Sequence, residues 1–309
     1  RTFRDVPYTT RPSLDDDTKN YVIPTTPFND VLDSLIVNLE SVKDDAVRRY
    51  YTDESANQWQ NSCKITRYAI YALLADLYLW KGDWDNSIKY CDMVSDYKRQ
   101  QYDEMIEREG NVNTIGLFGE IPMLLTKPTG STNCGNAYNL TFGEGNSFES
   151  IFELYFQNNQ TRQNTWVSNY YGNSNNPVGR LSAPDFLRKD VALGTNILFK
   201  KTDGRAYESV EEDASRYLVR KYAYTNVSYT TQNVTDEKSL KLATSMRANS
   251  YANWIFYRLS DMLLIKAEAL IQRSPEDYPA AFTMINIVNK RANDVTSVSR
   301  SDTLKMADY

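Results

Sequence analysis

The chain has 309 residues, of which 41% are hydrophobic, so it is long enough to bury a sizeable core. Its net charge of -5 and its pI of about 5.1 exclude the basic surface that a nucleic-acid-binding protein needs. Lys and Arg alternate with Asp and Glu throughout, and no apolar run approaches the roughly 20 residues that span a bilayer.

The absence of one residue type narrows the chemistry further, because the sequence contains no histidine. Histidine-dependent catalytic triads, histidine-based zinc sites and the commonest general base are therefore excluded. The three cysteines, Cys63, Cys91 and Cys134, are too few and odd in number for a disulfide scaffold, and they do not identify a compartment. We predict no catalytic residue, no metal site and no cofactor.

The first part of the chain is predicted to be irregular up to residue 26, since it carries three prolines and an acidic run at 15–17. That run lacks the spacing and the glycine of an EF-hand calcium loop, which favours a solvated loop. Thr26 and Pro27 then provide a helix N-cap followed by proline at the first helical position. Apolar residues follow at spacings of three and four, so an amphipathic helix is predicted at 27–43.

The stretch RYAIYALLADLYLWKGDWDNSIKYCDMV at 67–94 predicts two helices joined by a very short turn. Thr66 can cap the first helix, which is apolar around almost its whole circumference and should therefore pack between neighbours. Gly82 ends this helix, and a second one begins near Trp84. The two form an αα-hairpin, and we expect its tyrosines and tryptophans to belong mainly to the core.

The middle of the chain loses the helical periodicity. Seven glycines and two prolines at 110–146 predict a long, structured loop region. The sequence FESIFELYF at 148–156 is aromatic-rich and predicts a strand. Polar residues follow at 158–180, where we predict mainly loop.

The end of the chain repeats the helical pattern, with helices predicted at 257–271 and 280–291. The chain is thus predicted to contain helical hairpins at about 66–98 and 256–292, with a loop-rich part at about 110–250 between them. The pattern does not recur at the fixed period of a regular solenoid.

A family resemblance follows from the order of these segments. The first hairpin resembles a tetratricopeptide repeat at Tyr71, Leu74, Ala75, Tyr78, Ser87, Cys91 and Val94. The chain as a whole resembles the SusD/RagB family, the nutrient-binding surface lipoproteins of Bacteroidota. The segments that carry this resemblance are RDVPY at 4–8, TTPFNDVLDSLIVNLES at 25–41, KITRYAIYALLADLYLWKGDWDNSIKYCDMV at 64–94, FESIFELYF at 148–156, YLVRKY at 217–222, NWIFYRLSDMLLIKAEALI at 253–271 and INIVNKRAN at 285–293.

The resemblance implies a mainly α fold of tetratricopeptide-like helical hairpins with long irregular loops and a few short strands. It implies one incomplete SusD-like domain over residues 1–309, with the signal peptide and lipid-bearing cysteine upstream of Arg1 and a C-terminal portion beyond Tyr309. It also implies a non-enzymatic protein, lipid-anchored on the extracellular face of the outer membrane. Such a protein would bind an oligosaccharide and pass it to a TonB-dependent, SusC-like barrel.

The segment TWVSNYYGNSNN at 165–176 is the first candidate for ligand binding. Trp166, Tyr170 and Tyr171 lie there among asparagines, including Asn169, without a periodicity that would bury them. Sugar rings present apolar faces that stack on aromatic rings, and amide side chains hydrogen-bond their hydroxyls. The alternative is that these rings fold back on one another as a local cluster.

Other candidates carry less weight. The segment AYTNVSYTTQN at 223–233 contains Tyr224 and Tyr229 among polar residues, and Trp59 lies in a polar stretch before the first hairpin. Asp261 and Glu268 share one predicted helix, so they cannot face each other across a cleft as a glycosidase pair does. We therefore expect them to form ion pairs or to cap neighbouring segments.

Three alternatives to oligosaccharide uptake remain open at this point. The ligand can be a peptide, as expected for the RagB-like branch of the family. The abundance of Asp and Glu leaves a glycoside hydrolase to be considered, although no catalytic pair is identifiable. A purely structural tetratricopeptide adaptor would bind neither kind of ligand.

Overall fold

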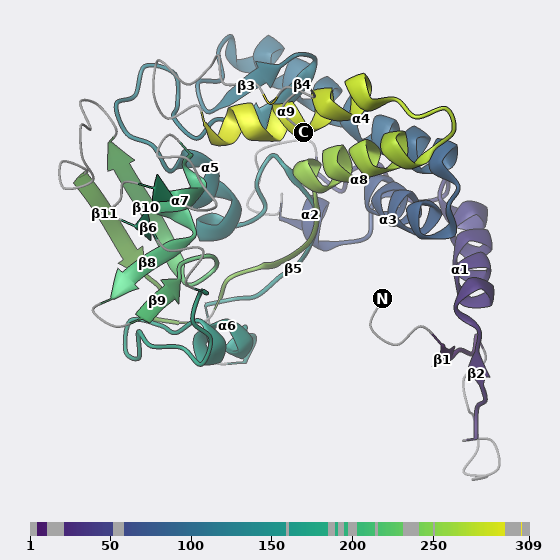
Figure 1. Ribbon diagram of the computed structural model, residues 1–309, viewed down its shortest axis with the longest axis horizontal. Coiled ribbons are helices and arrows are strands. Elements are labelled where there is room, and N and C mark those ends of the chain that lie inside the picture. The colour runs from purple at the N-terminus through teal and green to yellow at the C-terminus, as the bar shows by residue number, and fades with distance from the viewer. Residues whose placement is uncertain are drawn as a thin grey trace.

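The structure is a computed structural model that describes residues 5–10, 22–51, 59–158, 161–184, 189–190, 195–196, 203–213, 216–230, 241–249, 251–293 and 304. Long helices gather on one side of the molecule and most of the strands on the other (Figure 1). The acidic run at 15–17 lies outside the described residues.

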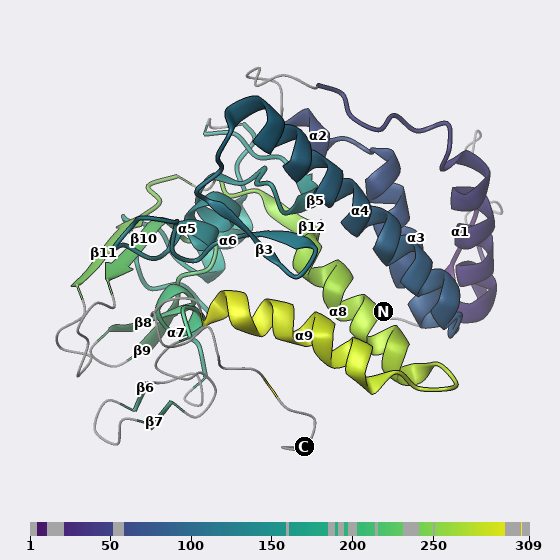
Figure 2. The ribbon, with the colours of Figure 1, turned by 90° about the horizontal axis from the view of Figure 1, so that it is seen from above.

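The long helices are packed side by side in the order α1, α3, α4, α8 and α9 (Figure 2). The helices are α1 (Phe28–Val42), α2 (Gln60–Cys63), α3 (Arg67–Lys81), α4 (Trp84–Glu109), α5 (Asn136–Tyr138), the π-helix η2 (Asn139–Glu144), α6 (Thr165–Tyr170), α7 (Arg205–Glu208), α8 (Leu259–Gln272) and α9 (Tyr278–Ala292). The predicted amphipathic helix at 27–43 is confirmed as α1, but the predicted cap is wrong, because Pro27 and not Thr26 is the N-cap residue and Thr26 belongs to β2. The mainly α, tetratricopeptide-like fold predicted from the sequence is also confirmed.

The strands pair two by two, and every pair among the described residues is antiparallel. The pairs are β1 (Val6–Pro7) with β2 (Thr25–Thr26), β3 (Ile115–Phe118) with β4 (Ile121–Leu124), β5 (Ser150–Leu154) with β12 (Trp254–Arg258), β6 (Lys189–Asp190) with β7 (Thr195–Asn196), β8 (Val210–Asp213) with β9 (Arg216–Val219), and β10 (Tyr224–Thr230) with β11 (Lys241–Met246). The strand predicted at 148–156 is confirmed as β5.

The first hairpin forms for the local reasons that its sequence indicates. The Thr66 hydroxyl accepts the Ala69 N–H at 3.2 Å and so caps α3. Gly82 ends α3 at a φ of 81°, a left-handed conformation that favours glycine. The next residue, Asp83, caps α4 by accepting the Asn86 N–H at 3.2 Å.

Helix α4 is longer than the sequence pattern indicated, since it continues to Glu109 where we expected the hairpin to end near residue 98. Tyr102, Met105 and Ile106 explain the extension, because they pack against a second core cluster beyond the hairpin. Gly110, at a φ of 73°, ends the helix.

The predicted loop at 110–146 also contains regular structure, namely the β3–β4 hairpin and the helices α5 and η2. The helix expected to start at Tyr257 begins two residues later, because Trp254–Arg258 pair with β5 as a strand. Asp261 caps α8 by accepting the Arg258 N–H at 2.9 Å, which confirms the structural role expected for it.

The tyrosines at 68, 71, 78 and 90 of the first hairpin are core residues, as the sequence predicted for most of its aromatic residues, whereas Trp80 is exposed. Tyr68, Tyr71 and Tyr78 are all buried, and the ring of Tyr90 packs between those of Tyr71 and Tyr78. The hydroxyls of Tyr78 and Tyr90 donate to one carboxylate oxygen of Glu40 in α1, at 2.8 and 2.6 Å. These bonds fix α1 against the hairpin.

A buried carboxylate joins the second helical hairpin to the strands. Glu149 is fully buried, and its Oε1 accepts the Leu124 N–H of β4 at 3.0 Å and the Arg291 guanidinium of α9 at 2.7 Å. Its Oε2 accepts the Ser260 hydroxyl at 3.2 Å, and its carbonyl accepts the Leu259 N–H at 2.9 Å. One residue thereby contacts β4, α8 and α9.

Two further properties of the described residues bear on function. None of their helices is both long and apolar enough to cross a membrane. Within the same part of the chain, His, Cys, Asp and Glu do not gather in a group of three or more that could hold a metal ion.

We predict that Arg291→Met lowers the free energy of unfolding by about 3–5 kcal/mol, because it leaves the buried Glu149 carboxylate without its cationic partner. Urea denaturation followed by circular dichroism measures this change. Lys81→Met is the matched control: it breaks the exposed pair with Asp33 and should cost less than about 1 kcal/mol. Equal losses in the two variants would contradict the central role of Glu149.

Candidate functional site

The predicted ligand segment contains a short helix, α6, where the sequence pattern had indicated none. Val167 is buried and anchors the helix to the body of the protein. The side-chain amide of Asn164, immediately before α6, donates to the Ala252 carbonyl at 3.0 Å. Trp166 and Asn169 point away from this anchor, because both are exposed. The buried Val167 and the Asn164 hydrogen bond together hold the helix against the body of the protein.

The loop after α6 folds through its own polar groups. Gly172 ends the helix at a φ of 98°, and a side chain there would collide with the Pro177 carbonyl. The Asn173 side chain accepts the N–H groups of Asn175 and Asn176 at 3.0 and 2.9 Å, an Asx turn. Asn173 therefore shapes the loop.

The aromatic residues of this segment form what we call the α6 cluster: Trp166, Tyr170, Tyr171 and Trp254. Trp166 stacks on Tyr170 with ring centroids 4.8 Å apart, and it meets Tyr171 and Trp254 edge-on at 5.0 and 5.2 Å. Trp166 nevertheless remains 41% exposed. The rings do fold together, as the alternative interpretation expected, and part of the Trp166 indole is still accessible from solvent.

Three of the predicted site residues share one face of α6. Asn169 and Tyr170 follow Trp166 by three and four positions, the spacing that places side chains side by side on a helix. Tyr170 and Tyr171 are half-buried, and Asn169 is exposed. An aromatic surface with an amide beside it is therefore available at this place.

The other two predicted site residues are located in the core. Tyr229 is 1% exposed and Tyr224 is 5% exposed, and both belong to a buried cluster around β10. The Tyr229 hydroxyl donates to Glu208 at 3.1 Å, and the Tyr224 hydroxyl donates to Glu211. Because neither ring presents a face to solvent, we do not retain them as ligand contacts.

Glu208 is itself affected by this environment. Burial raises the pKa of Glu208 to about 7, although the hydrogen bond from Tyr229 and the charge of Arg291 act in the opposite direction. The carboxyl group is therefore protonated in a large fraction of molecules near neutral pH.

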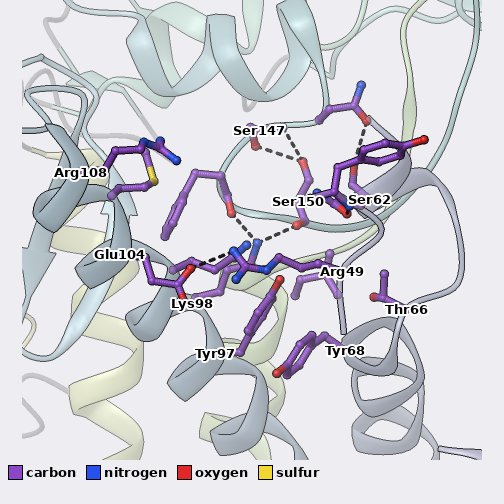
Figure 3. A pocket seen from close by; sticks show the side chains of 17 residues that line it. Arg49, Ser62, Thr66, Tyr68, Tyr97, Lys98, Glu104, Arg108, Ser147 and Ser150 are labelled. Atoms are coloured by element: carbon purple, nitrogen blue, oxygen red, sulfur yellow. Dashed lines mark hydrogen bonds and ion pairs between the residues drawn. The ribbon is translucent and has the colours of Figure 1, made fainter. Parts of the chain in front are cut away.

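A cavity of about 450 Å³ lies between α2, α3, α4 and the segment before β5 (Figure 3). This volume is within the range of small-molecule sites. Its lining includes Arg49, Asn61, Ser62, Tyr68, Tyr97, Lys98, Gln101, Glu104, Arg108 and Ser147. The lining is largely polar, with one wall made by the stacked rings of Tyr68 and Tyr97, whose centroids are 3.5 Å apart.

Some polar side chains of this cavity already have hydrogen-bond or ion-pair partners within the described part of the protein, and one does not. Lys98 donates to the carbonyls of Phe148 and Ser150 at 2.6 and 2.9 Å, and burial lowers its pKa to about 8. Arg49 pairs with Glu104 at 2.9 Å. In contrast, Oε1 of Gln101 is buried without a hydrogen-bond partner among the described residues. A ligand that donates a hydrogen bond to this amide would remove that deficit.

Sequence reasoning did not identify this cavity, because three separate segments build it. The nearest signal was Trp59, which the sequence had marked as a minor candidate. Trp59 lies immediately before α2, and Tyr155 lies immediately after β5. The two rings stack with their centroids 4.3 Å apart. This stack holds α2, which contributes Asn61 and Ser62 to the lining.

The stacked hairpins define a tetratricopeptide-like helical scaffold, and sequence comparison now gives its family. The profile of the SusD family matches residues 48–305, so the chain belongs to the SusD family. No curated protein matches the chain significantly.

Solved structures show the same fold at low sequence identity. A SusD homolog from Bacteroides thetaiotaomicron has a TM-score of 0.55 and 20% identity, over 96% of this chain and 56% of its own. Surface glycan-binding protein A from Bacteroides uniformis has a TM-score of 0.54 and 17% identity, over 94% and 55%. A laminarin-binding SusD-like protein has a TM-score of 0.56 and 15% identity, over 96% and 60%. The chain thus spans 55–60% of the length of these three structures.

We predict a pH-dependent effect of Glu208→Gln on stability. The wild-type carboxyl binds a proton more tightly in the folded chain than in the unfolded one, whose pKa is near 4.5. Its contribution is therefore complete below pH 4.5 and is lost as the pH rises through about 7. Between pH 4.5 and 7 the free energy of unfolding of the variant should therefore rise relative to that of the wild type, by at most about 3 kcal/mol.

Urea denaturation at a series of pH values from 4 to 8.5 measures this difference. Glu268→Gln, on the exposed face of α8, is the matched control and should follow the wild type at every pH. A difference between Glu208→Gln and the wild type that stays constant with pH would contradict the raised pKa of Glu208.

Proposed function

We propose that this chain binds an oligosaccharide at the cell surface without catalysis and delivers it to a TonB-dependent, SusC-like barrel for uptake. The proposal places the protein on the extracellular face of the outer membrane, held there by an N-terminal lipid anchor. The observation that carries it is the α6 cluster, in which Trp166 is exposed beside Asn169 and Tyr170.

The chemistry of the cluster fits a sugar. An exposed indole can stack on the apolar face of a pyranose ring, while the Asn169 amide can donate to and accept from its hydroxyls. Tyr170, Tyr171 and Trp254 pack around Trp166 from behind and beside it, so its orientation is fixed before a ligand arrives. A platform that is already ordered loses little side-chain entropy on binding.

The comparisons support this proposal at the level of the fold. Two proteins that share it are described as a surface glycan-binding protein and as laminarin-binding. Their identities of 17% and 15% are too low to transfer individual residues. The choice of the α6 cluster therefore rests on its exposure and chemistry.

The acidic residues support a binding protein over a hydrolase. Glu149 and Glu153 are fully buried and accept hydrogen bonds from neighbouring segments, and Asp261 caps α8. Glu268 is exposed on the same helix as Asp261. The first three carboxylates serve packing and capping, and Asp261 and Glu268 share one helix, so they cannot face each other across a cleft as a glycosidase pair must.

The expected affinity is modest, as suits a protein that releases its ligand to a transporter. An aromatic contact contributes roughly 0.5–1.5 kcal/mol beyond area burial. A few such contacts with hydrogen bonds give about 4–8 kcal/mol, which corresponds to a dissociation constant between millimolar and micromolar.

We predict that Trp166→Ala weakens glycan binding five- to thirtyfold, a loss of about 1–2 kcal/mol. Affinity electrophoresis against a panel of polysaccharides would identify a retained glycan, and isothermal titration would give its dissociation constant. Trp80→Ala is the matched control, because Trp80 is 47% exposed on the helical scaffold. Its binding should equal that of the wild type.

Other outcomes would redirect or reject the proposal. Unchanged binding by Trp166→Ala together with weakened binding by Gln101→Leu would move the site to the 450 Å³ cavity. Binding to a panel of peptides but to no glycan would favour peptide uptake. Release of reducing sugar, abolished by one carboxylate substitution, would contradict a non-catalytic role.

A further inference from the structure

A second, smaller cavity of about 110 Å³ lies among η2, α7, the start of α8 and the end of α9. Its charged lining residues are Arg205, Glu208, Lys221, Arg258 and Arg291. Four cations and one carboxylate around so small a space are an unusual concentration of like charge, because each ionic group normally has an opposite partner when it leaves bulk water.

Two of the four cations are neutralised by other residues. Arg291 pairs with Glu149 at 2.7 Å, and Arg205 forms a two-pronged contact with Asp203, the shorter distance being 2.6 Å. Their charges are therefore largely compensated outside the cavity.

The other two cations, Lys221 and Arg258, have no such partner among the described residues. Neither the Lys221 ammonium nor the Arg258 guanidinium makes a hydrogen bond or ion pair with a carboxylate in the part of the chain that the structure describes. Both lie against the ring of Phe142, at 4.7 Å for Lys221 and 5.4 Å for Arg258. The shared ring and the electrostatic effect of Arg258 on Lys221 show that the two charges lie near each other at the cavity wall.

The surroundings disfavour these charges. Burial, with the charge of Arg291, lowers the pKa of Arg258. Burial also lowers the pKa of Lys221, to about 8, and the charge of Arg258 adds to this effect. Lys221 as a whole residue is exposed, although its ammonium lines the cavity.

Two acidic residues, Asp261 and Glu208, lie close enough to reduce the positive charge of the cavity. Asp261 lies near both cations and favours their charged forms, but it already accepts the Arg258 backbone N–H at 2.9 Å. Glu208 lines the cavity and faces Tyr229, Arg291, Asp203 and Arg205; burial raises its pKa to about 7. Near neutral pH the cavity therefore keeps a net positive charge.

We infer that this cavity binds a small oxyanion, such as sulfate, phosphate or a carboxylate group, between Lys221 and Arg258. Ser209 contributes a hydroxyl to the lining. Arginine guanidinium and lysine ammonium groups are the usual partners of oxyanions in proteins.

The size of the cavity defines what can enter it. A volume of 110 Å³ equals about four waters at roughly 30 Å³ each, which accommodates an oxyanion and excludes an oligosaccharide. The anion is then either a free inorganic ion or the charged substituent of a larger ligand whose body remains outside. This inference does not depend on the proposed function.

Isothermal titration with sodium sulfate, at an ionic strength held constant with sodium chloride, tests whether the small cavity binds an oxyanion. We expect the wild type to bind sulfate, Lys221→Gln to bind at least tenfold more weakly, and Glu208→Gln to bind more tightly at pH 8 because a carboxylate has been removed. Lys89→Gln, an exposed lysine of α4, is the control and should equal the wild type. Circular dichroism confirms that each variant is folded.

Titrations with other anions distinguish a free ion from a charged substituent of a larger ligand. Sulfate binding would indicate a free ion, whereas binding of glucuronate or glucose 6-sulfate in the absence of sulfate binding would indicate a substituent. Either result supports the inference, provided that Lys221→Gln or Arg258→Gln weakens binding of the anion. The inference is overturned if none of these anions binds, or if both variants bind them as the wild type does.

Discussion

The contacts of one buried carboxylate, Glu149, determine how the helical scaffold and the strands fit together. It accepts hydrogen bonds from Leu124 in β4, from Ser260 at the start of α8 and from Arg291 near the end of α9. A buried charge of this kind is costly unless each lone pair is engaged, so the elements that satisfy it are held in one arrangement. The pairing of β5 with β12 begins beside this residue, where the Leu259 N–H donates to its carbonyl.

Both proposed binding places follow from the position of β12. Trp254, its first residue, packs edge-on against Trp166 and supports the α6 cluster. Arg258, its last residue, lines the small cationic cavity. A five-residue strand thus has an aromatic surface at one end and an uncompensated positive charge at the other.

The sequence predicted those features that depend on neighbouring residues. Thr66 and Gly82 determine the first hairpin locally, and the composition around Trp166 indicated an exposed aromatic segment. Features built from distant segments could not be predicted in this way. In β5 the acidic Glu153 is buried while Leu154 is 45% exposed, the reverse of the usual alternation, because Asn253 reaches Glu153 from a segment 100 residues away. The burial of Tyr229 and the cavity near Gln101 have the same kind of long-range origin.

The most direct test of the account is to observe the α6 cluster while a glycan binds. In a two-dimensional ¹H–¹⁵N NMR titration, the indole N–H of Trp166 and the side-chain amide of Asn169 report on the proposed surface. We expect both signals to shift with the same dissociation constant, while the indole signal of Trp80 stays in place. Shifts confined to the Gln101 amide and its neighbours, with Trp166 unchanged, would contradict the account.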